Sequence, residues 1–199
     1  MSKTRRLVIA SGNQGKIREF QGLLSSLPLE VVAQPDGIDV EENGSTFAAN
    51  ARIKAEAVAK RTGHWALADD SGLEVNALGG APGIHSARYA SGEKQGNATD
   101  SDNNAKLLRE MADVPEADRS AQFRCVLALT PLGQALRTEL FEGICRGRIS
   151  QSEAGGGGFG YDPLFIPDGF TQSFAELGSA TKNTLSHRAK ALANLAAFF

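Results

Sequence analysis

The chain alternates short apolar runs with longer segments in which apolar residues recur at helical spacing, and this alternation constrains its fold most. Residues 5–10 (RRLVIA) form the first apolar run, and residues 16–27 follow with the spacing of an amphipathic helix. A second run, residues 30–33, precedes an Ala-rich segment that Ser45 or Thr46 can cap as a helix. This helix is expected to run to about Arg61, and Gly63 suits its C-terminal end. This strand–helix–strand–helix order predicts helices packed against a sheet.

The rest of the chain adds further strands and a last helix. The strand-like segments are residues 65–68, 122–130, 135–146 and 164–166. Residues 131–134 (PLGQ) separate two of these segments and predict a hairpin. A short helix is expected at residues 103–111, and a last helix begins at Ser186, with alanines and leucines along one face. We therefore expect an α/β or α+β protein with a mixed sheet and helices packed against it.

Length and charge narrow the class of protein. A chain of 199 residues fits one domain, or one domain with two lobes, and no Pro- or Ser-rich linker divides residues 1–199. The formal net charge of −2 provides no broad attraction for nucleic acid or for an anionic membrane, so we expect neither as a partner. No apolar run approaches the ~20 residues of a membrane span, and Ser11-Gly12-Asn13 interrupts the segment that would resemble a signal peptide. We expect a cytoplasmic protein.

The first polar turn, Ser11-Gly12-Asn13-Gln14-Gly15, lies between a strand and a helix that starts at Lys16. Free backbone N–H groups and the positive end of the helix dipole favour an anion there, and a lysine adds a full positive charge. The spacing matches neither a Walker loop nor a dinucleotide-binding fingerprint. The alternative is a plain strand–helix turn.

Two adjacent carboxylates, Asp69 and Asp70, follow the apolar run at residues 65–68, and we expect them at the C-terminal end of that strand. Ligands commonly bind at such strand ends in α/β sheets. Neighbouring side chains on a strand diverge, so one carboxylate can ligate a metal while the other orients a water or a ligand. Hard oxygen ligands favour Mg²⁺ or Mn²⁺ over zinc. Asp-Asp-Ser-Gly is also good turn chemistry, which leaves a turn as the alternative.

Further polar residues lie before and on the Ala-rich helix. Glu41 and Glu42 provide another carboxylate in the preceding loop, or simply a solvated acidic loop. Thr46, Asn50 and Lys54 are four residues apart, so they share one face of the helix. That polar face points either to water or to a site.

The C-terminal part offers an aromatic loop and a cationic helix start. Residues 155–162 (GGGGFGYD) carry two aromatic side chains, one of which can stack on a nucleobase if it is exposed. A surface loop anchored by its aromatics is the competing interpretation. Ser186 can cap the last helix, yet His187 and Arg188 oppose the helix dipole in its first turn. Both can be explained if they reach toward a ligand, and Lys182 can join them.

Together these segments resemble the inosine triphosphate/xanthosine triphosphate pyrophosphatase family. The matching motifs come in the family's order and at about its spacing, and the resemblance covers roughly residues 7–195. The motifs are Ser11-Gly12-Asn13-Gln14-Gly15-Lys16, Asp69-Asp70-Ser71-Gly72-Leu73, Gly79-Gly80-Ala81-Pro82-Gly83, Gly158-Phe159-Gly160-Tyr161-Asp162-Pro163, and Lys182 with Ser186-His187-Arg188.

The resemblance implies a long mixed sheet flanked by helices, two lobes around a central substrate cleft, and a homodimer. It implies hydrolysis of non-standard purine nucleoside triphosphates (ITP, dITP, XTP) to the monophosphate and pyrophosphate. By the same resemblance, Glu41 and Asp70 would ligate Mg²⁺, Asp70 would also accept a proton, and Asp69 would lie nearby. The substrate-binding residues would be Ser11, Gly12, Asn13, Gln14, Gly15, Lys16, Ser71, Phe159, Gly160, Tyr161, Asp162, Lys182, His187 and Arg188.

Three alternatives remain at this stage. One is a pyrophosphatase of the same fold that acts on modified pyrimidine or methylated nucleotides. Another is a nucleotide-binding protein without turnover, which the presence of Asp69, Asp70, Glu41 and Lys16 disfavours. A phosphotransferase is disfavoured because the sequence has no Walker or kinase loop.

Overall fold

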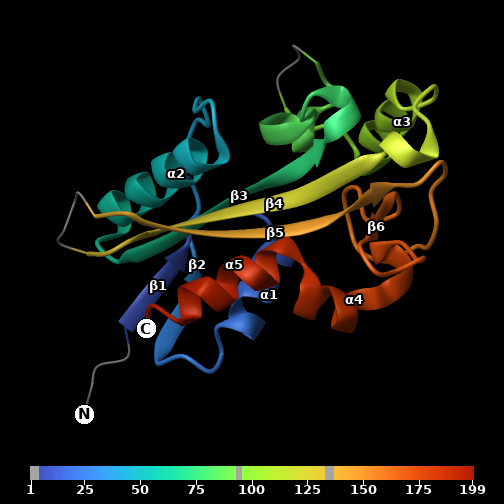
Figure 1. The fold of residues 1–199 in the computed structure, drawn as a ribbon. Helices are drawn as coiled ribbons and strands as arrows, with labels where there is room; N and C mark the ends of the chain where they lie inside the picture. The colour runs from blue at the N-terminus through green and yellow to red at the C-terminus, as the bar shows by residue number, and fades with distance from the viewer. Residues whose placement is uncertain (1–4, 93–95, 133–136) are drawn as a thin grey trace. The chain divides into compact units, whose positions relative to one another are not determined.

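The computed structural model of the chain describes residues 5–92, 96–132 and 137–199 (Figure 1). The sheet strands follow the order β2-β1-β3-β4-β5-β6. β1 is parallel to β2 and β3, whereas β5 and β6 are antiparallel, so the sheet is mixed as predicted. The strands are β1 Arg5–Ile9, β2 Leu29–Ala33, β3 Trp65–Val75, β4 Ser120–Thr130, β5 Glu139–Ile149 and β6 Phe165–Pro167. The helices are α1 Gln14–Leu23, α2 Phe47–Thr62, α3 Asp100–Glu110, α4 Phe174–Leu185 and α5 His187–Ala196, with short 3₁₀ helices η1 Asn76–Leu78, η2 Gly83–Arg88 and η3 Glu116–Asp118.

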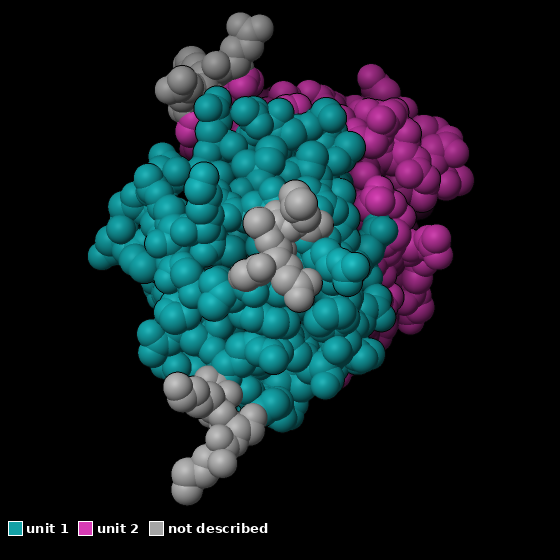
Figure 2. Space-filling view, turned by 90° about the vertical axis from the view of Figure 1, so that its left-hand side faces the viewer, with its two compact units in different colours: residues 1–70, 125–143, 191–199 teal, residues 71–124, 144–190 magenta. Residues whose placement is uncertain are grey.

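The chain divides into two compact units, which Figure 2 shows in different colours. The first unit comprises the described residues up to 70, 125–143 and 191–199, and the second comprises 71–124 and 144–190. Strands β3, β4 and β5 contribute residues to both units. Each unit has its own hydrophobic core.

The core of the first unit follows the period-two alternation of its strands. Leu7, Ile9 and Leu67 point to one face, where they pack with apolar residues of α1 and α5. Val8 and Ala66, which are also buried, point to the opposite face, which α2 covers (Figure 1). Buried on both faces, these strands read in the sequence as nearly continuous apolar runs.

Helix α2 begins and ends as its sequence predicts. Thr46 is the N-cap, and its hydroxyl accepts a hydrogen bond from Ala49 N at 3.1 Å. Gly63 takes the left-handed conformation at the C-terminal end, with φ of 66°. Ala51 and Ala55 are fully buried, and such small side chains let the helix approach the sheet closely. The helix thereby brings its polar residues near β3.

Strand β3 is much longer than predicted, and this corrects the expected position of the aspartates. The strand was expected to stop at residue 68, but it continues through Asp69 and Asp70 to Val75. The two carboxylates therefore lie within the strand, not at its C-terminal end, and the turn alternative is wrong. The reason is that the alternation of buried side chains resumes beyond Gly72, because Leu73 and Val75 are fully buried in the second unit's core.

The second unit contains a helix that the sequence did not predict. Helix α4 starts at a capping box, in which Ser173 Oγ accepts from Glu176 N and Glu176 Oε2 accepts from Ser173 N. The S-x-x-E pattern at residues 173–176 is the sequence signal for this helix start. Phe174 then enters an aromatic cluster with Phe123 and Phe165.

Several boundaries differ from the predictions by a few residues. Helix α1 ends at Leu23, where Leu24 N donates to Phe20 O and closes the last turn. Strand β5 begins at Glu139, and half of the predicted hairpin turn, residues 133 and 134, lies outside the described residues. Within the part of the chain that the structure describes, no helix combines the length and hydropathy needed to cross a membrane.

Candidate active site

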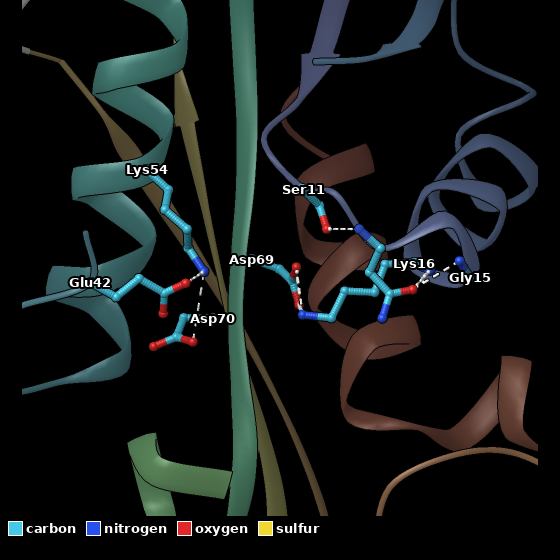
Figure 3. Close-up of polar contacts among 8 residues, drawn as sticks. Ser11, Gly15, Lys16, Glu42, Lys54, Asp69 and Asp70 are labelled. Atoms are coloured by element: carbon cyan, nitrogen blue, oxygen red, sulfur yellow. Dashed lines mark hydrogen bonds and ion pairs between the residues drawn. The ribbon is translucent and has the colours of Figure 1, made fainter. Parts of the chain in front are cut away.

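Strand β3 carries the two adjacent aspartates, and its pleat sends them to opposite faces (Figure 3). Asp69 faces Lys16 of α1, whose Nζ lies 2.9 Å from one carboxylate oxygen and 3.1 Å from the other. Asp70 lies on the side of α2, where Asn50 Nδ2 donates to Asp70 Oδ2 at 3.1 Å. The predicted divergence of the pair is therefore confirmed, and each aspartate meets a different helix.

Lys54 of α2 joins Asp70 to the loop before the helix (Figure 3). Its Nζ lies 3.8 Å from Asp70 Oδ1 and 3.0 Å from Glu42 Oε1. Burial of Lys54 opposes its charged form, but neighbouring carboxylates outweigh burial and raise the pKa of Lys54 above its ordinary value. Those carboxylates belong to Asp69, Asp70 and Glu42. Because Asn50 and Lys54 both contact Asp70, the polar face of α2 points into this cluster.

The structure separates the two neighbouring glutamates of that loop. Glu42 is half-buried and reaches Lys54, whereas Glu41 is exposed. The carboxylate that lies with Asp70 is therefore Glu42 and not Glu41, at which the sequence predicted a metal ligand. Nothing in the loop sequence distinguishes the two, because a loop has no fixed side-chain period that would show which residue points inward.

Asp70 is held in an environment that disfavours its charge. The residue is 8% exposed, and burial is the largest influence on its carboxyl, followed by the opposing charge of Lys54. The negative charges of Glu42 and Asp69 act in the same direction as burial, and the pKa of Asp70 rises from 3.8 to about 6. At neutral pH the group is therefore ionised and is a stronger base than an ordinary aspartate.

Asn50 connects Asp70 to the loop that carries Glu42. Its side-chain oxygen accepts from Gly44 N at 2.8 Å, while its amide nitrogen donates to Asp70. A Cβ atom on Gly44 would lie 2.6 Å from that oxygen and 2.7 Å from the Cβ of Ala49. Only glycine fits this close approach. The buried Asn50 therefore fixes the loop and the aspartate together.

The turn before α1 is built around its own cap. Asn13 Oδ1 accepts from Gly15 N at 2.8 Å and from Lys16 N at 3.1 Å, and Ser11 Oγ accepts from Asn13 N at 3.1 Å. The side chain of Asn13 thus satisfies two of the helix N–H groups that the sequence offered to an anion. Gln14 is exposed at the start of the helix. The local charge available to an anion here is that of Lys16.

A polar cavity of about 190 Å³ lies in the first unit beside these residues. It brings Lys16 and Lys54 together with carboxylates, and it also reaches the turn at Gly12. Its lining residues are Ala10, Ser11, Gly12, Lys16, Gln34, Ile38, Asp39, Val40, Glu42, Lys54, Val58 and Asp69. A larger hollow of about 820 Å³ near Arg6 and Arg61 contains none of the predicted site residues, so the chemistry favours the smaller cavity.

The second unit gathers another set of predicted residues around Phe159. This ring is 45% exposed, and Lys182 Nζ lies 4.2 Å from its centroid. Arg188 Cζ lies 5.9 Å from the same centroid. Asp162 Oδ2 accepts from Phe159 N at 2.9 Å and forms an ion pair with Lys182. An exposed aromatic face with two cations beside it suits a flat, electron-rich ring such as a nucleobase.

Other predicted residues of this unit are buried and pack inside it. Tyr161 is 4% exposed, and its hydroxyl donates to Ser86 O at 2.8 Å, so this aromatic anchors the loop. His187 is 5% exposed and stacks on Phe123 with ring centroids 4.8 Å apart. Ser186 caps α5, accepting from Ala189 N at 3.2 Å, as predicted. Ser71 follows Asp70 on β3 and is half-buried.

Comparison with known proteins gives a consistent result over nearly the whole chain. The model of the Ham1 family matches residues 7–198. The chain is 55% identical over 191 residues to the dITP/XTP pyrophosphatase of Parasynechococcus marenigrum (strain WH8102), a match that covers 96% of this chain and 93% of that protein. It is 48% identical over 194 residues to the dITP/XTP pyrophosphatase of Geobacillus kaustophilus (strain HTA426), covering 96% and 92%.

The fold is likewise similar to a solved structure. A HAM1 protein from Coxiella burnetii superposes with a TM-score of 0.89 at 41% sequence identity, covering 98% of each chain. The likeness therefore extends over both compact units.

Proposed function

We propose that this chain, which belongs to the Ham1 family, hydrolyses non-standard purine nucleoside triphosphates (ITP, dITP and XTP) to the monophosphate and pyrophosphate. The names of its relatives support this substrate class. One observation carries the chemistry, namely the 190 Å³ cavity in which Lys16 and Lys54 lie beside Glu42 and Asp69, with Asp70 in contact with Lys54. A family match over residues 7–198 supports treating the chain as a single pyrophosphatase domain.

The predicted site residues supply two kinds of group, and we assign them different parts of the substrate. The positive charge of the lysines and the Ser11 hydroxyl suit phosphate oxygens, whereas the exposed Phe159 and the cations beside its ring suit a purine. The phosphate residues are Ser11, Gly12, Asn13, Gln14, Gly15 and Lys16, with Lys54 added. The nucleoside residues are Ser71, Phe159, Gly160, Tyr161, Asp162, Lys182, His187 and Arg188, with Tyr161 acting through the loop that it anchors.

The residues around Asp70 fit a divalent metal ion, and we propose Mg²⁺. Glu42 and Asp70 both contact the Nζ of Lys54, so two hard oxygen donors lie close together. The two carboxylates carry more negative charge than the single positive charge of Lys54 can neutralise. Among the described residues no three His, Cys, Asp or Glu side chains form a ready-made site. Mg²⁺ usually takes one or two carboxylates and completes its coordination with water and substrate phosphates. We therefore assign the metal to Asp70 with Glu42, and Glu41 remains the alternative.

The proposed reaction places the proton acceptor on Asp70. A water attacks the α-phosphorus and gives its proton to the Asp70 carboxylate. The bond to the oxygen bridging the α- and β-phosphorus atoms breaks, and pyrophosphate leaves. Without metal the pKa of Asp70 is about 6, so its carboxylate is already ionised and able to accept a proton at neutral pH. Mg²⁺ would neutralise phosphate charge, and Lys16 and Lys54 would bind the departing oxygens.

Purine selection follows from hydrogen-bond polarity. Inosine and xanthosine carry a 6-keto oxygen where adenosine carries an amino group. A donor such as Arg188 or a backbone N–H satisfies the keto oxygen but faces the amino group donor to donor. An unpaired buried donor costs about 1–3 kcal/mol, so a few such contacts are needed for strong selectivity.

We also propose that the protein acts as a homodimer in the cytoplasm. Light scattering on purified protein measures the oligomeric state.

A substrate panel tests the proposed function. Pyrophosphate and monophosphate release are measured for ITP, dITP, XTP, dUTP and dTTP, each with Mg²⁺ and with EDTA. We expect Mg²⁺-dependent pyrophosphate release from the three purines. Preference for a pyrimidine would replace the substrate class, and tight ITP binding without release would identify a nucleotide-binding protein. Release of phosphate and a diphosphate would overturn the reaction itself.

A further inference from the structure

The loop that carries Phe159 is braced almost everywhere except at its exposed ring. Asp162 accepts from Phe159 N at 2.9 Å and pairs with Lys182, so the backbone on the N-terminal side of the ring is fixed. Gly158 is obligatory here, because its φ is +76° and a Cβ would lie 2.1 Å from Asp162 Oδ2. Tyr161 anchors the C-terminal side of the loop from the protein interior.

Helix α3 fixes the residue that follows the ring. Asp100 Oδ2 accepts from Gly160 N at 2.7 Å, and Asn104 Nδ2 donates to Gly160 O at 3.1 Å. Asp100 and Asn104 are four residues apart and therefore lie on the same face of the helix. Side chains of one helix thus bind both the N–H and the C=O of Gly160. In the sequence, Gly160 lies 60 positions after Asp100 and 56 positions after Asn104.

These contacts define the backbone on both sides of Phe159. Its own N–H is bound by Asp162, and the next peptide is bound through Asp100. When the backbone on both sides is fixed, the direction of the side chain is fixed as well, and the ring is presented without a loop-ordering penalty on binding. Asp100 is exposed at the start of α3, whereas Asn104 is 3% exposed. Replacing Asn104 would therefore disturb folding more than replacing Asp100.

We propose that Asp100, together with Asn104, is a positioning residue of the nucleobase site, and that it acts through Phe159. This inference rests on the proposed function, because it assigns the exposed ring to stacking on the purine. Neither residue belongs to the motifs singled out in the sequence. The proposal adds the first turns of α3 to the elements that control substrate affinity.

Asp100→Ala removes the acceptor at an exposed position, and Asp100→Asn retains an oxygen that can accept from Gly160 N. For Asp100→Ala we expect about a fivefold rise in KM for ITP with kcat nearly unchanged, because roughly one charge-assisted hydrogen bond is lost from a group that serves binding. Asp100→Asn should recover most of this rise. Asp102→Ala is the matched control, because it removes the same charge from the same helix turn and its carboxylate accepts from Thr99 Oγ1, at the N-cap of that helix.

A double-mutant cycle with Phe159→Ala separates positioning from general stabilisation. If Asp100 acts through the ring, Asp100→Ala should change KM by less than about twofold once Phe159 is already alanine. A fivefold effect in both backgrounds, or an equal effect of Asp102→Ala, overturns the proposal. Asn104→Asp, which sets a carboxylate against Gly160 O, should raise KM in the same Phe159-dependent way.

The Kd for ITP is also measured by calorimetry for the four proteins of this cycle. Binding and turnover together then distinguish failure of the proposed reaction from failure of the positioning role of Asp100. Wild-type protein that binds ITP with Phe159- and Asp100-dependent affinity but releases no pyrophosphate overturns the proposed reaction and leaves the positioning role. Turnover of ITP with a KM that depends on Phe159 but not on Asp100 overturns the positioning role alone. Binding that ignores Phe159 overturns the positioning role in either case.

Discussion

Asp70 in the first unit and Asp162 in the second are both buried aspartates beside a lysine, yet their surroundings differ in charge balance. Asp162 accepts from the backbone N–H of Phe159 and pairs with the ammonium group of Lys182 on α4, so its negative charge is matched by one lysine. Asp70 shares Lys54 with Glu42 and lies next to another carboxylate, and burial raises its pKa to about 6. A satisfied pair braces a loop, whereas an excess of negative charge leaves a group ready to take a proton or a cation. The same pairing of residues therefore supports different roles.

The largest expected effect separates the two aspartates directly. Asp70→Asn should lower kcat by about a thousandfold or more, because it removes the group that we propose as both proton acceptor and metal ligand. ITP binding should remain measurable by calorimetry. Asp162→Asn should instead act mainly on KM, since it loosens the loop behind Phe159. Near-normal turnover in Asp70→Asn would remove Asp70 from the mechanism and end the contrast.

A second substitution pair tests which glutamate completes the acidic cluster. Glu42→Gln should lower kcat/KM by about 10- to 100-fold and raise the Mg²⁺ concentration needed for half-maximal rate, in line with losing a metal ligand or its close partner. Glu41→Gln, one residue away and exposed, should change either quantity by less than about threefold. The reverse ranking would show that the loop rearranges when metal and substrate bind, and would restore Glu41 as the ligand.

Strand β3 shows which structural features the sequence predicts and which it does not. Its apolar run and the divergence of Asp69 and Asp70 were predictable, because both follow from strand periodicity. The length of the strand was not predictable, since the four polar or glycine residues at positions 69–72 resemble a turn. The strand continues because Leu73 and Val75 are buried in the core of the second unit. Burial of those two residues depends on packing with distant segments. Only the folded chain shows it.

The site shows the same division between local and distant information. The α2 stripe of Asn50 and Lys54 was recognisable from helical spacing, and the structure decides that it faces Asp70. No local signal showed that Glu42 is the glutamate that contacts Lys54, because Glu41 and Glu42 both lie in a loop. Asp100 precedes the helix predicted at residues 103–111, and neither it nor Asn104 had a visible target, since Gly160 lies more than fifty residues further along the chain.

A smaller effect is expected at the ring of the second unit. Phe159→Ala should raise KM for ITP by about tenfold with little change in kcat, because base stacking contributes roughly 1–3 kcal/mol and serves the ground state and the transition state alike. Phe159→Tyr keeps the flat face and should stay near wild type. A loss confined to kcat would place Phe159 in the chemistry instead, and the two units would no longer differ in role.

The last expected effect is on stability. Asp70→Asn should stabilise the metal-free protein at neutral pH, although the same substitution should lower its activity. Because the pKa of Asp70 is raised in the folded state, from 3.8 to about 6, the folded protein binds more protons than the unfolded chain between these values. Without metal, stability should therefore fall as pH rises through this window and then level off. Two pKa units correspond to about 3 kcal/mol at most, or several degrees in Tm for a chain of this size.

Asp70→Asn removes that titration, so in EDTA the variant should have a higher Tm than wild type at pH 7.5 and nearly the same Tm at pH 4. Scanning calorimetry across this range measures the difference. Mg²⁺ should raise the Tm of wild type and leave that of Asp70→Asn nearly unchanged, because only the carboxylate gains a partner. Asp162→Asn is the control and should be less stable than wild type at pH 7.5, because Lys182 loses its charged partner. Parallel curves of Tm against pH for wild type and Asp70→Asn would show that the charge of Asp70 is not unfavourable in the folded protein. Asp70 and Asp162 would then not differ in charge balance.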